Sequence, residues 1–135
     1  RPIVAAFVKT HKGGNHGIAY NLVVANTGTR PATRIRLSCD PSKLRRAFKC
    51  PDQVPFLDYI EPCFHPDRAI PLIVHGESVS NSFGMTSDDP RNATWIYEAS
   101  FPVAITYFDL SGKRFRSEVE LTIRDSDSFA GGRWA

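Results

Sequence analysis

The clearest pattern in the sequence is a pair of alternating segments near its end, SFPVAITYFD at 100–109 and RFRSEVELTI at 114–123. Apolar side chains share one face of each segment: Phe101, Val103, Ile105 and Tyr107 in the first, and Phe115, Val119, Leu121 and Ile123 in the second. A period of two is typical of a half-buried strand, and the intervening LSGK, with Gly112 at its tip, is a turn signal. The two segments therefore predict an antiparallel hairpin.

Shorter segments of the same kind occur along the rest of the chain. We expect strands at 3–9, 18–26, 33–39, 70–75 and 77–84, separated by turns that contain glycine, asparagine or proline. The polar stretch at 85–94 predicts a mobile loop. We find no long amphipathic helix and no repeat of fixed period in the sequence.

These elements predict an all-β fold, an antiparallel sandwich of seven to eight strands over residues 1–125. A long irregular connection at 40–69 is rich in proline, and SKLRRAFK within it places Leu44 and Phe48 on one face of one or two helical turns. Residues 126–135 show no period and are expected to form a flexible tail. A chain of 135 residues can bury the core of one domain without disulfides.

Residues 22–37 show how one strand gives way to the next. The apolar run ends at NTGTRPA, where Gly28 permits a turn and Pro31 lacks the N–H that would continue a ladder. The following TRIRLSC alternates, which predicts Ile35, Leu37 and Cys39 inward. Arg34 and Arg36 are then expected on the face that meets water.

The turn at 26–32 resembles the N-x-G-x-x-P-A turn of bacterial immunoglobulin-like domains, among them the adhesion-related CARDB-type modules. The segment ITYFDLSGKRFRSEVELTI resembles the closing hairpin of the same domains, in which a Tyr-containing strand turns at an Asp/Gly pair. This resemblance implies an immunoglobulin-like Greek-key sandwich that commonly lies next to a membrane anchor or another domain and does no chemistry. The long connection at 40–69 departs from the compact pattern.

Basic residues are concentrated between residues 30 and 49, where seven of them accompany a single acid, Asp40. The candidate binding face among them consists of Arg34, Arg36, Lys43, Arg45, Arg46 and Lys49. Such a cluster either contacts nucleic acid or anionic lipid or is a solvated face near an anionic neighbour. We favour the solvated face, because Phe48 is the only aromatic residue there and the net charge of the chain is only +3.

Three cysteines and one histidine, Cys39, Cys50, Cys63 and His65, supply the atom types that zinc prefers. Their spacing contains no close cysteine pair of the kind that fixes two ligands, so we expect no metal and no cofactor. A disulfide that includes Cys39 is an alternative, but free thiols are favoured. Three cysteines are too few for a disulfide scaffold in a chain of this size, which slightly favours a reducing compartment, on the cytoplasmic side of a membrane.

No motif in the sequence indicates a catalytic centre. HGES offers His75 and Ser78, but no G-x-S-x-G elbow exposes the serine, and Glu118 and Glu120 alternate with arginines that neutralise them. We therefore expect a non-enzymatic interaction or sensing domain whose partner is a protein, either a second copy or another domain.

No stretch approaches the roughly 18 apolar residues of a membrane span. The chain starts at Arg1 rather than at Met. We accordingly expect a processed or excised soluble part of a larger protein. The resemblance to immunoglobulin-like domains further implies a bacterial protein, anchored to a membrane by a segment outside the sequence.

Overall fold

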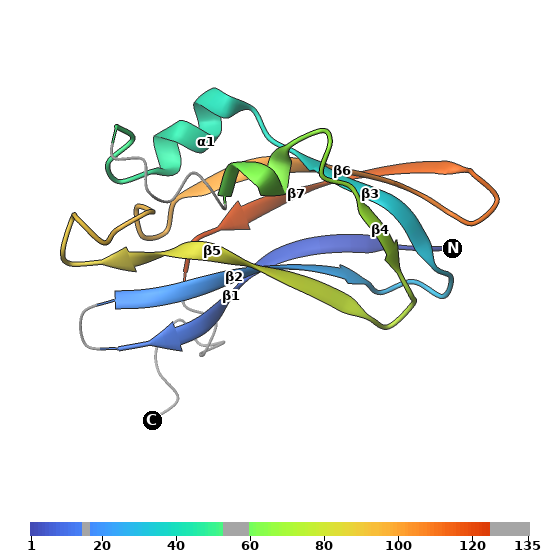
Figure 1. Ribbon diagram of the computed structural model, residues 1–135, viewed down its shortest axis with the longest axis horizontal. Coiled ribbons are helices and arrows are strands. Elements are labelled where there is room, and N and C mark those ends of the chain that lie inside the picture. The colour runs from blue at the N-terminus through green and yellow to red at the C-terminus, as the bar shows by residue number, and fades with distance from the viewer. Residues whose placement is uncertain (15–16, 53–59, 125–135) are drawn as a thin grey trace.

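The computed structural model describes residues 1–14, 17–52 and 60–124, and their strands form two antiparallel sheets (Figure 1). One sheet has the order β1-β2-β5 and the other the order β4-β3-β6-β7. The strands are β1 (Val4–Gly13), β2 (Gly17–Asn26), β3 (Ala32–Ser38), β4 (Ile70–Ile73), β5 (Ser78–Ser87), β6 (Ser100–Phe108) and β7 (Arg114–Thr122). The predicted all-β sandwich is confirmed.

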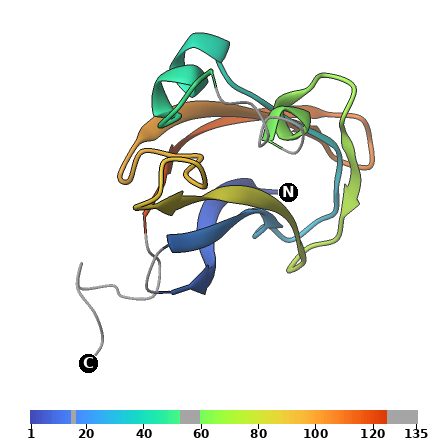
Figure 2. The same ribbon diagram turned by 60° about the vertical axis from the view of Figure 1, so that its left-hand side comes forward.

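The chain changes sheet between β2 and β3, again between β4 and β5, and a third time between β5 and β6. Figure 2 shows the two sheets as separate layers. The predicted hairpin is the β6–β7 pair, which runs in unbroken register from Ser100 opposite Thr122 to Phe108 opposite Arg114. A Greek-key connection stays a prediction.

The turn after β2 is organised by Asn26, whose side chain is buried. Its amide nitrogen donates to the carbonyl oxygens of Arg30 (2.7 Å) and Ile73 (3.0 Å), and its Oδ1 accepts from the backbone N–H groups of Ile3 and Gly28. A Cβ on Gly28 would collide with the Arg1 carbonyl oxygen and lie 2.5 Å from the Ile3 nitrogen. The glycine is therefore needed for close approach of the N-terminal segment, not for a positive φ.

Strand β3 confirms the predicted alternation, since Ile35 and Leu37 are 0% and 5% exposed while Arg34 and Arg36 face solvent. A bulge against β6, between Thr33 and Arg36, adds one feature that alternation does not reveal. Arg34 takes φ +50° there, and its guanidinium lies 3.9 Å from the centre of the Phe108 ring. The bulge thus turns this arginine onto an aromatic side chain.

The connection at 40–69 contains helix α1 (Pro41–Ala47), as expected from SKLRRAFK, and the 3-10 helix η1 (Glu61–Phe64). Asp40 caps α1 by accepting hydrogen bonds from the Ser42 N–H (2.9 Å) and hydroxyl (2.8 Å), and these bonds lower the pKa of its carboxyl. Leu44 and Phe48, which the sequence placed on one face, are both buried. The middle of this connection, 53–59, lies outside the described residues, as does the predicted tail at 126–135.

Several predicted boundaries are wrong, among them that of the strand predicted at 70–75, which ends at Ile73. The first hairpin is longer than expected, because β1 continues to Gly13 and β2 begins at Gly17. The stretch predicted as a loop from residue 85 belongs to β5 as far as Ser87, since Met85 and Thr86 pair with this longer hairpin. Thr86 is buried, and its hydroxyl lies 3.2 Å from that of Tyr20.

An aromatic cluster fills one end of the core around Trp95, which is fully buried. The indole stacks on Phe101 with centroids 5.5 Å apart and contacts Phe48 and Phe83, and its N–H donates to the Phe83 carbonyl oxygen. The cluster joins α1, β5 and β6. Within the part of the chain that the structure describes, no helix has both the length and the apolar character required to cross a membrane.

Candidate functional site

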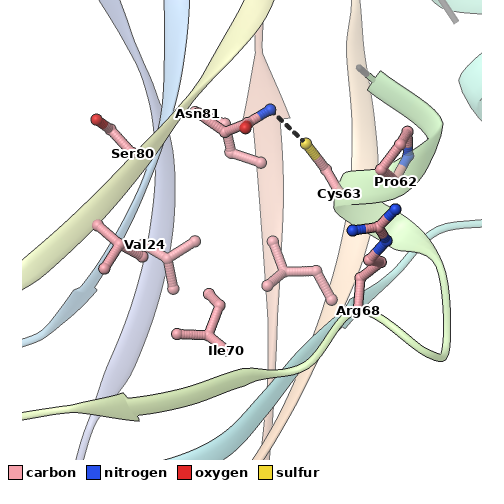
Figure 3. A pocket seen from close by; sticks show the side chains of 10 residues that line it. Val24, Pro62, Cys63, Arg68, Ile70, Ser80 and Asn81 are labelled. Carbon is pink, nitrogen blue, oxygen red and sulfur yellow. Dashed lines mark hydrogen bonds between the residues drawn. The ribbon is translucent and has the colours of Figure 1, made fainter. Parts of the chain in front are cut away.

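The two long sides of the sandwich differ. On one side β1 and β7 lie together, where the Ser117 hydroxyl donates to the Val4 carbonyl oxygen at 3.3 Å. On the other side β5 and β4 are the outer strands of their sheets. A groove of about 440 Å³ opens between them, next to η1 (Figure 3).

The floor of this groove is made of core side chains, Leu22 and Val24 from β2 and Leu37 from β3. All three are at most 5% exposed. Their position follows from strand alternation, because each belongs to the inward row of its strand. The volume is within the range of sites that hold small ligands or a few side chains of a partner.

The walls come from segments far apart in the sequence. Val79, Ser80 and Asn81 of β5 line one side, and Pro62, Cys63, Arg68 and Ile70 line the other. Figure 3 shows the Asn81 amide turned toward the Cys63 sulfur, to which it donates at 3.2 Å. This contact links the edge of one sheet to η1, which lies between β3 and β4 of the other sheet in the chain.

The groove offers no activated nucleophile among its described residues. Burial raises the pKa of the Cys63 thiol, so the neutral form predominates near neutral pH even though the Asn81 hydrogen bond opposes the shift. Among the described residues of the lining Arg68 is the one charged side chain, and no described carboxylate lies within ion-pair distance of it. Chemically the described lining combines apolar side chains with one cation, one amide and one thiol.

The backbone of β5 also faces this side. In an antiparallel pair, residues that exchange hydrogen bonds with the partner strand alternate with residues whose N–H and C=O groups point away from it. The Asn26 N–H donates to the Glu77 carbonyl oxygen at 3.0 Å, which places Ser78, opposite Ala25, in the outward-pointing class. Ser80 follows two residues later and belongs to the same class. None of the described residues pairs with the outward backbone groups of Ser78 and Ser80.

The other outer strands are protected against pairing with a further strand. β4 has four residues including Pro71, β7 alternates charges on its outer face, and β1 carries Lys9, Lys12 and a bulge near its end. Residues 78–82 of β5, SVSNS, contain no charge and no proline, and the bulge of the β2–β5 pair lies beyond them. This stretch is the least protected edge of the described sheets.

The structure divides the predicted basic residues between two places. Arg34 and Arg36 are on the outer face of the four-stranded sheet, where Arg34 stacks on Phe108 and the Arg36 Nε donates to the Pro66 carbonyl oxygen at 2.9 Å. Across β6, Arg36 is opposite Thr106, which in turn is opposite Arg116. Arg34 and Arg36 therefore lie on the same sheet as the arginines of β7, and not beside the basic residues that follow them in sequence.

The remaining four basic residues are on or just after α1. Arg45 forms an ion pair with Asp52 at 2.6 Å, and the Lys49 ammonium donates to the Ser87 carbonyl oxygen at 3.4 Å. For Lys43 and Arg46 the described residues include no hydrogen-bonded or ion-paired partner. Four of the six predicted residues thus have a partner within the chain, and the solvated face stays a prediction.

The cysteines and histidine considered for zinc have different surroundings. Cys39 lies at the end of β3, the Cys50 sulfur is 3.9 Å from the Pro90 carbonyl oxygen, and Cys63 lines the groove. No disulfide joins these three cysteines, and His65 accepts from the Asp67 N–H. Over residues 1–14, 17–52 and 60–124, no group of three His, Cys, Asp or Glu side chains is arranged to hold a metal ion.

Comparison with known proteins gives one family. A family model described as a domain of unknown function (DUF8453) matches residues 1–127. No curated protein matches the chain.

Proposed function

The chain belongs to the DUF8453 family of domains of unknown function, and from its surface we propose that it is a non-enzymatic interaction domain. It binds an extended segment of another protein along β5. The segment pairs with the outward backbone groups of Ser78 and Ser80. Its side chains enter the groove between β5 and β4.

One observation carries this proposal. Ser78 and Ser80 present N–H and C=O groups that no described residue pairs with, directly beside an apolar groove of about 440 Å³. Strand addition uses both elements, since the backbone bonds supply affinity and the pockets for alternate side chains supply specificity. The resemblance to immunoglobulin-like domains supports the same class of function by analogy.

The chemistry of the groove supports a binding role without catalysis. The two titratable side chains among its described residues are an arginine and a thiol whose pKa is raised by burial, and neither is suited to general base catalysis near neutral pH. His75 and Ser78, the pair considered from the sequence, are both exposed, and neither side chain lines the groove.

The test is selection of short random peptides displayed on phage against the purified domain. We expect selected peptides to bind the Ser80→Ala variant, which keeps the backbone N–H, and to lose binding to Ser80→Pro, which lacks it. The proline removes no bond to β2, because the Ser80 N–H points away from that strand, so a melting curve close to that of Ser80→Ala is expected.

Peptide chemistry gives a second test that leaves the domain unchanged. Every second residue of a selected peptide should pair with β5. N-methylation of the backbone nitrogens of those residues should abolish binding, and N-methylation of the residues between them should spare it. Equal binding by both methylated forms, or by both Ser80 variants, would contradict strand addition.

A further inference from the structure

The side chains of β5 show which residues of an added strand would reach the groove. Val79 is opposite Val24 and Asn81 is opposite Leu22, so both belong to the row that faces the other sheet. A strand hydrogen-bonded to β5 continues this row with every second residue. Those residues would lie over Leu37, between Val79 on one side and the opposing wall on the other.

The opposing wall combines an apolar residue with a cation. Ile70 is half-buried beside the groove, and Arg68, two residues earlier, is exposed at its rim. The nearest acid in sequence, Asp67, lies 3.8 Å from the ring of His65. Within the described part of the chain the Arg68 guanidinium therefore has no carboxylate partner, while its planar fork suits one.

From this arrangement we infer that the bound segment carries a carboxylate that pairs with Arg68 and, on the same face of the strand, an apolar side chain that packs between Val79 and Ile70. The inference rests on the proposed strand addition and specifies the chemistry of its partner: an extended acidic and apolar segment of another protein. A side chain two residues from the carboxylate is on the same face, which gives the motif acidic-x-apolar in either direction.

The experiment uses the same peptide selection and then exchanges charge. Selected peptides should be enriched in Asp or Glu two residues from Val, Ile or Leu. Replacing that acid by its amide should weaken binding roughly three- to tenfold, as expected for one partly screened charged hydrogen-bonded pair. The Arg68→Glu variant should reject the acidic peptide and accept the same peptide with lysine in place of the acid.

The matched control is Arg114→Glu, which makes the same change of charge at an exposed position on β7. It should bind the acidic peptide as the wild type does, because β7 is at the other side of the four-stranded sheet. An equal loss of affinity in Arg68→Glu and Arg114→Glu would indicate an effect of net charge alone and would overturn the inference.

The remaining outcomes separate this inference from the proposed function. Peptides that need the Ser80 N–H but show no acidic preference and no response to Arg68→Glu would overturn the carboxylate pairing and leave strand addition standing. Selection of no peptide, together with a dimer that Ser80→Pro dissociates and Ser80→Ala does not, would assign the edge to a second copy of the chain. That result would overturn both the partner proposed here and its chemistry.

Discussion

The side-chain amide of Asn26 donates to the carbonyl oxygen of Ile73 at 3.0 Å, which joins the end of β2 in one sheet to the end of β4 in the other. We expect Asn26→Ala to lower the free energy of unfolding by about 2–4 kcal/mol, because it leaves one buried and three partly buried backbone groups without partners. Chemical denaturation of the two proteins measures the difference.

Asn26→Asp is the control for shape. It keeps the oxygen that accepts from Ile3 and Gly28 but loses the two donors to Arg30 and Ile73. A carboxylate oxygen then faces two carbonyl oxygens, so at neutral pH this variant should also be clearly less stable than the wild type. Wild-type stability in both variants would contradict a structural role of the amide.

The register of β3 gives the second prediction. Leu37→Ala should cost about 2–5 kcal/mol as a truncation of a buried side chain. Arg36→Ser should change stability by no more than about 0.5 kcal/mol, since the arginine faces solvent and its one described bond, to the Pro66 carbonyl oxygen, is exposed. Equal effects in urea denaturation would show that the assigned faces are exchanged.

The third prediction concerns the basic residues of α1. We expect the double variant Arg45→Glu/Arg46→Glu to fold normally, because both side chains are exposed and an exposed ion pair such as Arg45–Asp52 contributes little. At physiological salt neither protein should bind a generic oligonucleotide or acidic vesicles. Wild-type binding that falls steeply with salt and is lost in the double variant would instead establish an anion-binding face.

Burial, with a further contribution from Asp40, raises the pKa of the Cys39 thiol to about 11. Because thiolate is the reactive form, roughly one thiol in a thousand is ionised at pH 8, and alkylation by iodoacetamide should be slow until the protein unfolds. The unfolded chain loses this proton at lower pH than the folded chain. The stabilisation from the neutral Cys39 thiol is therefore complete below the ordinary thiol pKa of 9.0 and is lost as pH rises through about 11.

Cys39→Ser isolates this effect. Between pH 9 and 11 the wild type should lose more stability than the variant, measured as the difference between their melting temperatures at each pH. A constant difference across that interval would contradict the raised pKa.

Much of the fold could be predicted from local patterns, and the errors have a common cause. Alternation identified the inward row of β3 and the hairpin of β6 and β7 because each strand has one buried face. The end of β5 was missed because Gly84 and the polar residues after it are turn signals. What keeps Met85 and Thr86 in a strand is pairing with Ala19 and Ile18, which are distant in sequence.

The groove could not be predicted in the same way. Its lining combines residues from β2, β3, η1, β4 and β5 and from the segment before β4, and none of these carries a local motif. Leu37 and Val24 could be predicted as core residues, but not as the floor of a groove. The one usable signal was SVSNS at 78–82, a strand-length stretch without charge or proline, which is unusual for an outer strand.

The contact between Ser117 and Val4 joins residues 113 positions apart, and it has a consequence for the order of folding. During synthesis β1 and β2 can pair early, but the side of the sandwich formed by β1 and β7 cannot close until almost the whole chain has emerged. Contacts of such long separation slow folding, because loop entropy is lost before they form. We therefore expect β1 to remain an open outer strand until late in folding, which is the interval in which a nascent chain is most exposed to aggregation.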